Sequence, residues 1–349
     1  MQRNKMKRIL IIRFSAIGDV AMTVPIVHSL AVQYPDLEIT MLSREALRPI
    51  FKEMPSNVRF IGADLKGKHH GISGLNKLFS ELAAHKFDAV ADFHNVLRTQ
   101  YLDLRFRLKG VKVAKIDKGR TGKRKLVRRT NKVFVRQKSL FQRYTDVLET
   151  LGLPISANFD SIFGKGKGDF SQIQDVVGLK QEKWLGIAPF ALHKGKIYPM
   201  DKMEQVIAHF SKDPRVRIFL FGGGQHEQVI FDDLVAKYPS VMSMIGKLNM
   251  EKELILMSYL DLMLSMDSSN MHLASLVNTP VLSIWGATHP YAGFLGWKQL
   301  PINTIQIEDL TCRPCSVYGQ KPCYRKDYAC LNQIAPTTII DRIERDFSL

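Results

Sequence analysis

The sequence predicts an α/β protein with two doubly wound parallel sheets, each in its own domain. Three observations support this prediction. The chain has 349 residues, which suits two domains of ordinary size. Short apolar runs alternate with helix-like segments along both halves, and a Gly/Lys-rich stretch of low hydrophobicity, 161–181, lies between the two series. Apolar residues make up 45% and charged residues 24% of the chain, which excludes a disordered, collagen-like or small disulfide-stabilised protein.

The expected strands are near-continuous runs of Ile, Leu, Val and Phe, a pattern typical of parallel strands that are buried on both faces. The first domain, 1–170, contains a periodic apolar stretch at 20–32 that predicts a helix packed on its sheet. The second domain, 171–349, repeats the same alternation. The expected strands are 8–14, 38–42, 58–61, 89–93 and 111–116 in the first domain, and 184–189, 215–221, 241–245, 262–265 and 281–285 in the second.

Charge is concentrated in one part of the chain. The net charge is +17, and the segment 98–138 holds sixteen basic and two acidic residues, or +14 of that total. Such a concentration points to an anionic partner, although a solvated charged helix would show the same composition. The first residues have a basic start but an apolar run of only 9–12, unlike a signal peptide, and no run is long enough to span a membrane. We therefore expect a cytoplasmic protein.

Ligands of open parallel sheets bind beyond the carboxyl ends of the strands, so the strand-to-helix turns are the places to search. The first such turn is FSAIGDV, 14–20, in which Gly18 permits a tight turn and Asp19 falls at the start of a helix. Asp19 can be a helix cap, since Asp is favoured there. It can also be a general base that takes a proton from an acceptor hydroxyl.

Two further turns follow strands of the second domain. The turn ALHKGKIYP, 191–199, carries Lys194 and Lys196, which are either solvated or able to neutralise a phosphate. The turn FGGGQHE, 221–227, lets the backbone approach a ligand closely, with N–H groups at Gly223 and Gly224, although it is not a GxGxxG motif. Gln225 could hydrogen-bond a ribose or a base.

The richest turn is SMDSSNMHLASL, 265–276, at the end of another expected strand. Its hydroxyls and the first N–H groups of the following helix could bind an anion, and helix capping alone would explain part of the pattern. The neighbouring loop ATHPYAGFLGW, 287–297, adds polar and glycine residues. Two adjacent turns built for close approach predict a phosphate site with the residues Asp267, Ser268, Ser269, His272 and Thr288.

Four cysteines lie close together in the sequence, spaced C-x2-C-x7-C-x6-C: Cys312, Cys315, Cys323 and Cys330. The opening C-x2-C resembles half of a zinc site, but the remaining spacings are irregular. A structural zinc ion, free or packed thiols, and disulfides all remain open, with disulfides disfavoured in a reducing compartment.

Together, these turns resemble glycosyltransferase family 9, the bacterial ADP-heptose:lipopolysaccharide heptosyltransferases. The resemblance covers nearly the whole chain and is carried by the order of its motifs. They are RILIIRFSAIGDVAMTVPIVHSL, FQRYTDVLETLGLP, KIYP, GGGQHE, DSSNMHLASL, WGATHPYAGFLGW and CLNQIAP. Ser269 and Asn270 replace the usual Gly and Pro of the family, and His289 stands where an Asp is frequent.

The resemblance implies a GT-B fold, in which two Rossmann-like domains face each other across a cleft. It also implies inverting transfer of a heptose from ADP-heptose onto the lipopolysaccharide inner core. By this resemblance 1–170 is the acceptor-side domain and 171–349 the nucleotide-sugar donor domain, whose last helix can return to the first domain. Asp19 matches the family's base and Lys196 the lysine that meets the donor diphosphate. The implied donor-binding residues are Lys194, Gly223, Gly224, Gln225, Asp267, Ser268, Ser269, His272 and Thr288.

The basic segment lies in the implied acceptor domain, where it suits an anionic lipid A acceptor and the inner face of the inner membrane. The acceptor-binding residues expected there are Arg98, Arg120, Lys123 and Arg124. No acidic DxD motif that would hold Mg²⁺ is present, since Asp232 and Asp233 fall in an expected helix, so we predict transfer without a metal ion. The alternative is a nucleic-acid-binding protein that uses the segment 98–138. That alternative explains the charge but not the turns.

Overall fold

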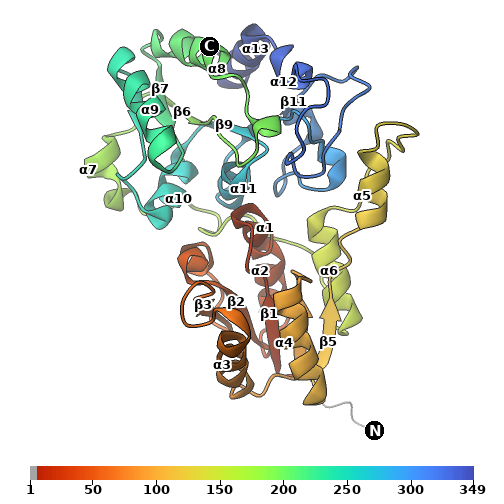
Figure 1. Cartoon of the computed structure of the whole chain (residues 1–349). Helices are drawn as coiled ribbons and strands as arrows, with labels where there is room; N and C mark the ends of the chain where they lie inside the picture. Colours follow the sequence, from red (N-terminus) through yellow and green to blue (C-terminus); the bar gives the residue numbers. More distant parts are fainter. Residues whose placement is uncertain (1–5) are drawn as a thin grey trace. The chain divides into compact units, whose positions relative to one another are not determined.

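The computed structural model describes residues 6–349 and divides into two α/β units (Figure 1). The first unit comprises Met1–Lys118 and Lys138–Ile162. The second comprises Gly119–Gln137 and Phe163–Leu349. Each unit contains one sheet in which every strand pair is parallel, and this confirms the predicted fold class.

The sheet of the first unit has the strand order β3-β2-β1-β4-β5. Its central strand, β1, is buried on both faces, with Ile9, Leu10, Ile11 and Ile12 fully inaccessible. This explains why the strand is a continuous apolar run rather than an alternating one. The strands are β1 (Arg8–Ile12), β2 (Glu38–Arg44), β3 (Val58–Ala63), β4 (Ala89–Asp92) and β5 (Lys112–Lys115). The helices are α1 (Ile17–Ala21), α2 (Val24–Gln33), α3 (Gly71–Ala83), α4 (Leu97–Leu108) and α6 (Leu140–Thr150), with a 3-10 helix at Glu45–Phe51.

The helix expected at 20–32 is two helices, α1 and α2. Pro25 lies in the first turn of α2. Because proline has no N–H and a fixed φ, it is accommodated at the start of a helix and not in the interior. The apolar periodicity is continuous through this break, so it could not reveal that the helix is interrupted.

The sheet of the second unit has the strand order β11-β10-β9-β6-β7-β8. All ten strands expected from the sequence are present in the two sheets, with ends shifted by one or two residues. The additional strand, β11, has only two residues, too few for a periodic pattern. The strands are β6 (Lys183–Ala188), β7 (Val216–Leu220), β8 (Val241–Ser243), β9 (Leu262–Met266), β10 (Val281–Ile284) and β11 (Thr304–Ile305). The helices are α5 (Arg120–Leu126), α7 (Gln174–Val177), α8 (Met200–Ser211), α9 (Gln225–Lys237), α10 (Met250–Tyr259), α11 (Ser269–Leu276), α12 (Ala329–Asn332) and α13 (Pro336–Phe347).

The units differ from the expected domains 1–170 and 171–349 in two respects. The main boundary lies at 162/163, and the segment Gly119–Gln137 belongs to the second unit. The last helix, α13, packs on α8 in the second unit and places Ile339, Ile343 and Phe347 in that unit's core. Its apolar face is therefore covered within the second unit.

Specific contacts hold the segment Gly119–Gln137 on the second unit. Lys132 Nζ donates to the carbonyl oxygens of Thr311, Arg313 and Pro314 at 2.9, 2.6 and 3.1 Å. Gln137 N donates to the carbonyl oxygen of Tyr291 at 2.9 Å. The expected basic segment is therefore divided: residues 98–118 belong to the first unit and 119–137 to the second.

Across residues 6–349, the helices are all too short or too polar to cross a lipid bilayer.

Candidate functional site

The turn after β1 places Asp19 as the third residue of α1. Asp19 Oδ2 accepts a hydrogen bond from Ala16 N at 3.3 Å, so Asp19 does cap this helix. The same carboxylate forms an ion pair with the Arg13 guanidinium. The side chain of Asp19 is still 26% exposed, so capping leaves it accessible to a substrate hydroxyl.

Arg13 is the first functional residue that the sequence reasoning missed. It directly follows β1, and there it only interrupted an apolar run. The structure buries Arg13 to 6% exposure, and its guanidinium bridges Asp19 and the carbonyl oxygen of Phe93, the latter at 2.7 Å. A planar guanidinium with several donors suits such a bridge. Arg13 therefore fixes the orientation of Asp19 and keeps a positive charge beside it.

His94 is the second missed residue. It follows β4, the neighbour of β1 in the sheet, and its ring lies 3.5 Å from both Phe14 N (at Nδ1) and Ser15 Oγ (at Nε2). Burial, together with the nearby Arg13 charge, lowers the pKa of His94 to about 3. His94 is thus a neutral imidazole at physiological pH. The available signal was its place directly after a strand adjacent to β1.

A buried carboxyl pair supports the His94 turn. Asp92 Oδ1 accepts hydrogen bonds from His94 N and Asn95 N, both at 2.8 Å. Asp92 is inaccessible and Asp103 is 3% exposed. Burial, together with the nearby Asp92 charge, raises the pKa of Asp103 to about 8. A proton is therefore held within this pair, since two like charges so close in the interior cannot both ionise.

In the second unit, three strand ends meet at one carboxyl edge. Lys196 follows β6, Asp267 follows β9 and Thr288 follows β10, and these strands are adjacent in the order β10-β9-β6. Lys196 Nζ lies 3.0 Å from Asp267 Oδ2, and Thr288 Oγ1 donates to the same oxygen at 2.8 Å. The side chains of Lys196 and Asp267 are 16% and 7% exposed. The structure thus brings together three residues that the sequence nominated from separate turns.

Backbone contacts position the Lys196 loop. Ala287 N donates to the carbonyl oxygen of Gly195 at 2.8 Å. A Cβ at Gly195 would lie 2.9 Å from Ala287 Cβ and 3.1 Å from the carbonyl oxygen of Gly319, so only glycine fits. The loops after β6 and β10 are therefore joined directly before Lys196.

Arg313, which the sequence analysis did not predict, holds the loop that follows β10. It is 4% exposed and donates to the carbonyl oxygens of Gly286 at 2.6 Å and Thr288 at 3.0 Å. Burial lowers its pKa to about 10, so it remains a cation at neutral pH. Its position between the first two cysteines was the only signal, and it drew attention to the thiols instead.

The helix α11 begins at the same edge. Its N-cap residue, Ser268, makes no side-chain cap bond to the helix, and its Oγ lies 3.2 Å from Ser265 Oγ. Ser268 and Ser269 are half-buried, and His272 is 8% exposed. The start of an eight-residue helix beside Lys196 and Asp267 adds positive potential to this edge.

The glycine turn after β7 stands apart from these contacts. Gly223, Gly224 and Gln225 are exposed, and Gly223 N donates to Glu227 Oε2 at 2.8 Å. Lys194 is also exposed, with Nζ 5.2 Å from the centre of the Tyr328 ring. These residues line the same unit, but the structure does not join them to the Lys196–Asp267 pair.

The expected acceptor cations are divided between the units. Arg98 is exposed on α4 of the first unit, whereas Arg120 and Arg124 are exposed on α5 of the second. Lys123 is 4% exposed, and its Nζ lies 4.1 Å from the centre of the Phe294 ring. Lys123 packs inward because α5 rests on the loop that follows β10.

The four cysteines are not disulfide-bonded. Cys330 is 6% exposed, and burial raises its pKa to about 12, so it is a packed thiol. In the described part of the chain, 6–349, no three His, Cys, Asp or Glu residues are arranged to hold a metal ion.

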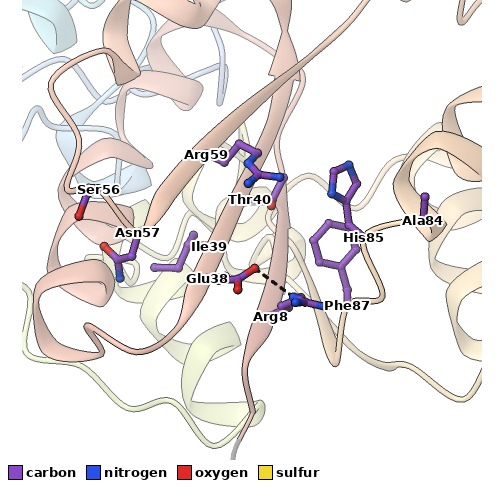
Figure 2. A pocket seen from close by; sticks show the side chains of 10 residues that line it. All are labelled: Arg8, Glu38, Ile39, Thr40, Ser56, Asn57, Arg59, Ala84, His85 and Phe87. Atoms are coloured by element: carbon purple, nitrogen blue, oxygen red, sulfur yellow. Dashed lines mark hydrogen bonds and ion pairs between the residues drawn. The ribbon is translucent and has the colours of Figure 1, made fainter.

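A pocket of about 460 Å³ lies at the edge of the first sheet where the strands begin (Figure 2). It is lined by Arg8 and Glu38, whose ion pair measures 3.0 Å, and by residues at the amino ends of the strands. Arg8 begins β1, whereas Asp19 follows its carboxyl end. The pocket is therefore remote from Asp19, at the edge where open parallel sheets do not bind their ligands.

Two doubly wound units with charged turns at the carboxyl edges of their sheets define a GT-B type protein. Two solved structures share this fold. One is the family 9 glycosyltransferase of Veillonella parvula (TM-score 0.76, 20% identity, 98% of this chain and 97% of that chain). The other is Escherichia coli ADP-heptose lipopolysaccharide heptosyltransferase II (TM-score 0.71, 17% identity, 98% of both chains).

The sequence comparisons identify the family. The family model described as glycosyltransferase family 9 (heptosyltransferase) matches residues 75–322, well over half of the chain. Lipopolysaccharide heptosyltransferase 3 of E. coli K12 is 24% identical over 298 residues, covering 83% of this chain and 84% of the relative. The chain belongs to glycosyltransferase family 9 and is a glycosyltransferase. This confirms the resemblance seen in the motifs and does not favour the nucleic-acid-binding alternative.

Proposed function

We propose that this glycosyltransferase transfers a heptose from ADP-heptose onto the inner core of lipopolysaccharide, with inversion at the anomeric carbon. The observation that carries the proposal is the meeting of Lys196, Asp267 and Thr288 at one sheet edge. The names of the relatives support the substrates, since one acts with ADP-heptose on lipopolysaccharide and another is a lipopolysaccharide heptosyltransferase.

On the donor side, Lys196 stabilises the leaving diphosphate. Its ammonium group has three N–H donors, and Asp267 takes one of them at 3.0 Å, so two can reach phosphate oxygens. Thr288 holds Asp267, and the start of α11 at Ser268 and Ser269 adds further N–H groups. These groups supply the positive potential that a metal ion would otherwise provide, so transfer without a metal ion is part of the proposal.

The remaining donor contacts are assigned to exposed groups of the second unit. Lys194 reaches an outer phosphate oxygen, the N–H groups of the Gly223–Gly224 turn approach the nucleotide, and Gln225 hydrogen-bonds the ribose. His272, on the first turn of α11, contacts the donor from its buried position.

On the acceptor side, Asp19 is the base. The acceptor hydroxyl attacks the anomeric carbon in line, its proton passes to the Asp19 carboxylate, and the bond from that carbon to the diphosphate oxygen breaks. Arg13 keeps the carboxylate oriented, and the neutral His94 adds a hydrogen-bonding group without a competing charge.

The acceptor's phosphates and carboxylates meet Arg98, Arg120 and Arg124, all exposed. Lys123 has a different part in this proposal: it anchors α5 on Phe294. Action on a lipid-linked acceptor places the enzyme in the cytoplasm, peripheral to the inner face of the inner membrane.

The test is a transfer assay with ADP-heptose and a heptose-free lipopolysaccharide, read as ADP release and as the mass gain of the acceptor. We expect Asp19→Asn to lower the rate about 100-fold or more, because general base catalysis contributes about 10²–10⁴. Asp146→Asn is the matched control, since Asp146 is half-exposed and pairs with Lys138 at 2.8 Å. Near-normal transfer by Asp19→Asn would refute the assignment of the base. Absence of transfer by the unmodified enzyme would refute the substrates.

A further inference from the structure

An exposed leucine stripe runs along α4 of the first unit. Leu97, Leu104 and Leu108 are 86%, 56% and 77% exposed. Their spacings of seven and four residues put them on one face of a helix. The opposite face, with Leu102 and Phe106 among its buried residues, packs on the sheet beside β4 and β5. The helix therefore has two apolar faces, and its own unit covers only one of them.

Cations border the stripe, and no acid faces outward from the helix. Arg98 and Arg107 are exposed on α4, and Lys109 is exposed directly after it. The only acidic residue of α4 is Asp103, which is 3% exposed and turned inward. Lys112 and Lys115 on β5, a strand in contact with α4, are exposed as well. The face thus combines bulky apolar side chains with neighbouring cations.

We propose that this face of α4 is a membrane-docking surface that inserts its three leucines into an anionic lipid layer. The inference deepens the proposed function, which requires a lipid-linked acceptor. Apolar side chains of an interfacial helix enter the boundary between headgroups and acyl chains, while Lys and Arg remain at the level of the lipid phosphates. Each cation near an anionic membrane surface adds to the attraction.

Other occupants fit this face less well. Two copies of α4 packed face to face would place cationic borders against each other. The phosphates of a nucleic acid would pair with the cations, but they would leave the three leucines exposed to water. A lipid layer with anionic headgroups satisfies both the leucines and the cations.

The test is co-sedimentation of the full chain with vesicles, which needs no enzymatic activity. We expect binding to vesicles of equal parts phosphatidylglycerol and phosphatidylcholine, weak binding to phosphatidylcholine alone, and loss of binding at high salt. Replacing Leu97, Leu104 and Leu108 together with Ser should weaken binding at least about tenfold, because burying each leucine is favourable. The matched control replaces three residues of the second unit with Ser, namely Leu179, Leu300 and Ile302, which are 59%, 58% and 72% exposed.

A second variant shows insertion directly in a folded protein. In Leu104→Trp, the new indole should shift its fluorescence to shorter wavelength on anionic vesicles. The unmodified chain is the reference for this shift, since Trp184 and Trp285 are fully buried and Trp297 is half-buried in the second unit. Arg107→Gln combined with Lys109→Gln should reduce binding several-fold and weaken its salt dependence.

Four results would overturn the proposal: no vesicle binding, equal binding to neutral vesicles, full binding by the triple serine variant, or a dimer that this variant dissociates. Activity separates this inference from the proposed function. The triple variant should act normally on a deacylated, water-soluble acceptor and poorly on a membrane-embedded one. An enzyme that binds vesicles as expected but transfers no heptose would refute only the proposed substrates.

Discussion

The two sheets carry opposite charges at corresponding places. At the carboxyl edge of the first sheet, Asp19 is held by the buried cation Arg13. At the carboxyl edge of the second, Lys196 is held by the buried anion Asp267. Asp19 depends on a partner at the end of its own strand, whereas Lys196 depends on Asp267 and Thr288, which follow two other strands. Each charged side chain therefore has a buried counter-charge. For Asp19 it comes from the same stretch of chain, and for Lys196 it comes from a neighbouring strand of the sheet.

A large effect is expected at the edge built from three strands. Lys196→Ala should lower kcat/KM about 100-fold, because it removes the cation that meets the developing charge of the diphosphate, a contribution of about 3 kcal/mol. It should also destabilise the second unit, since Asp267 is left buried without its cationic partner. Transfer kinetics and chemical unfolding measure the two effects.

Lys237→Ala is the control for loss of a lysine ion pair. Lys237 is half-exposed and pairs with Glu204 at 3.2 Å and Asp233 at 2.7 Å, away from the sheet edge. An exposed pair contributes about 0–1 kcal/mol, so this variant should remain stable and active. Equal losses in the two variants would contradict the assigned role of Lys196.

The fold was predictable because each buried strand is a run of apolar residues flanked by helix-like segments. All ten expected strands are present, and the turns that follow them carry the nominated Asp19, Lys196, Asp267 and Thr288. The sequence alone could not show to which of the two units a connecting segment attaches. Residues 119–137 join the second unit because Lys132 binds carbonyl oxygens of residues 311, 313 and 314, and no periodicity reports such a contact.

The supporting residues of the site were also beyond sequence reasoning. Arg13, His94 and Arg313 act through contacts with distant backbone or turns, such as Arg13 with Phe93 and Arg313 with Gly286. A single sequence shows which residues follow strands. It does not show which buried cation faces which carboxylate, because that depends on how neighbouring strands align in the sheet.

A smaller effect is expected at the carboxyl edge of the first sheet, where Arg13 pairs with Asp19. Arg13→Met should lower the transfer rate about tenfold and the free energy of unfolding by about 1–3 kcal/mol, because Asp19 and the Phe93 carbonyl lose a charged donor. The loss is limited because Asp19 is 26% exposed and water can replace part of the interaction. Arg13→Lys should restore part of the rate, since it keeps the charge but not the planar fork. A fully active Arg13→Met would show that Asp19 needs no local counter-charge.

The smallest effect on transfer is expected for the buried pair Asp92 and Asp103, which lies behind the carboxyl edge of the first sheet. The pKa of Asp103 is raised to about 8 in the folded state, while an unfolded Asp titrates near ~4. Between these pH values the folded chain holds a proton that the unfolded chain has released, so stability falls as pH rises through this window and levels off above it. Asp103→Asn removes that slope, because an amide does not titrate in this range. In the second unit, burial raises the pKa of Glu253 to about 7. The fall of stability with pH that Glu253 causes therefore ends near that pH. The other titrating groups are the same in both proteins, so the difference between their slopes from pH 7 to 8 reports Asp103, and equal slopes there would mean that the pair holds no proton.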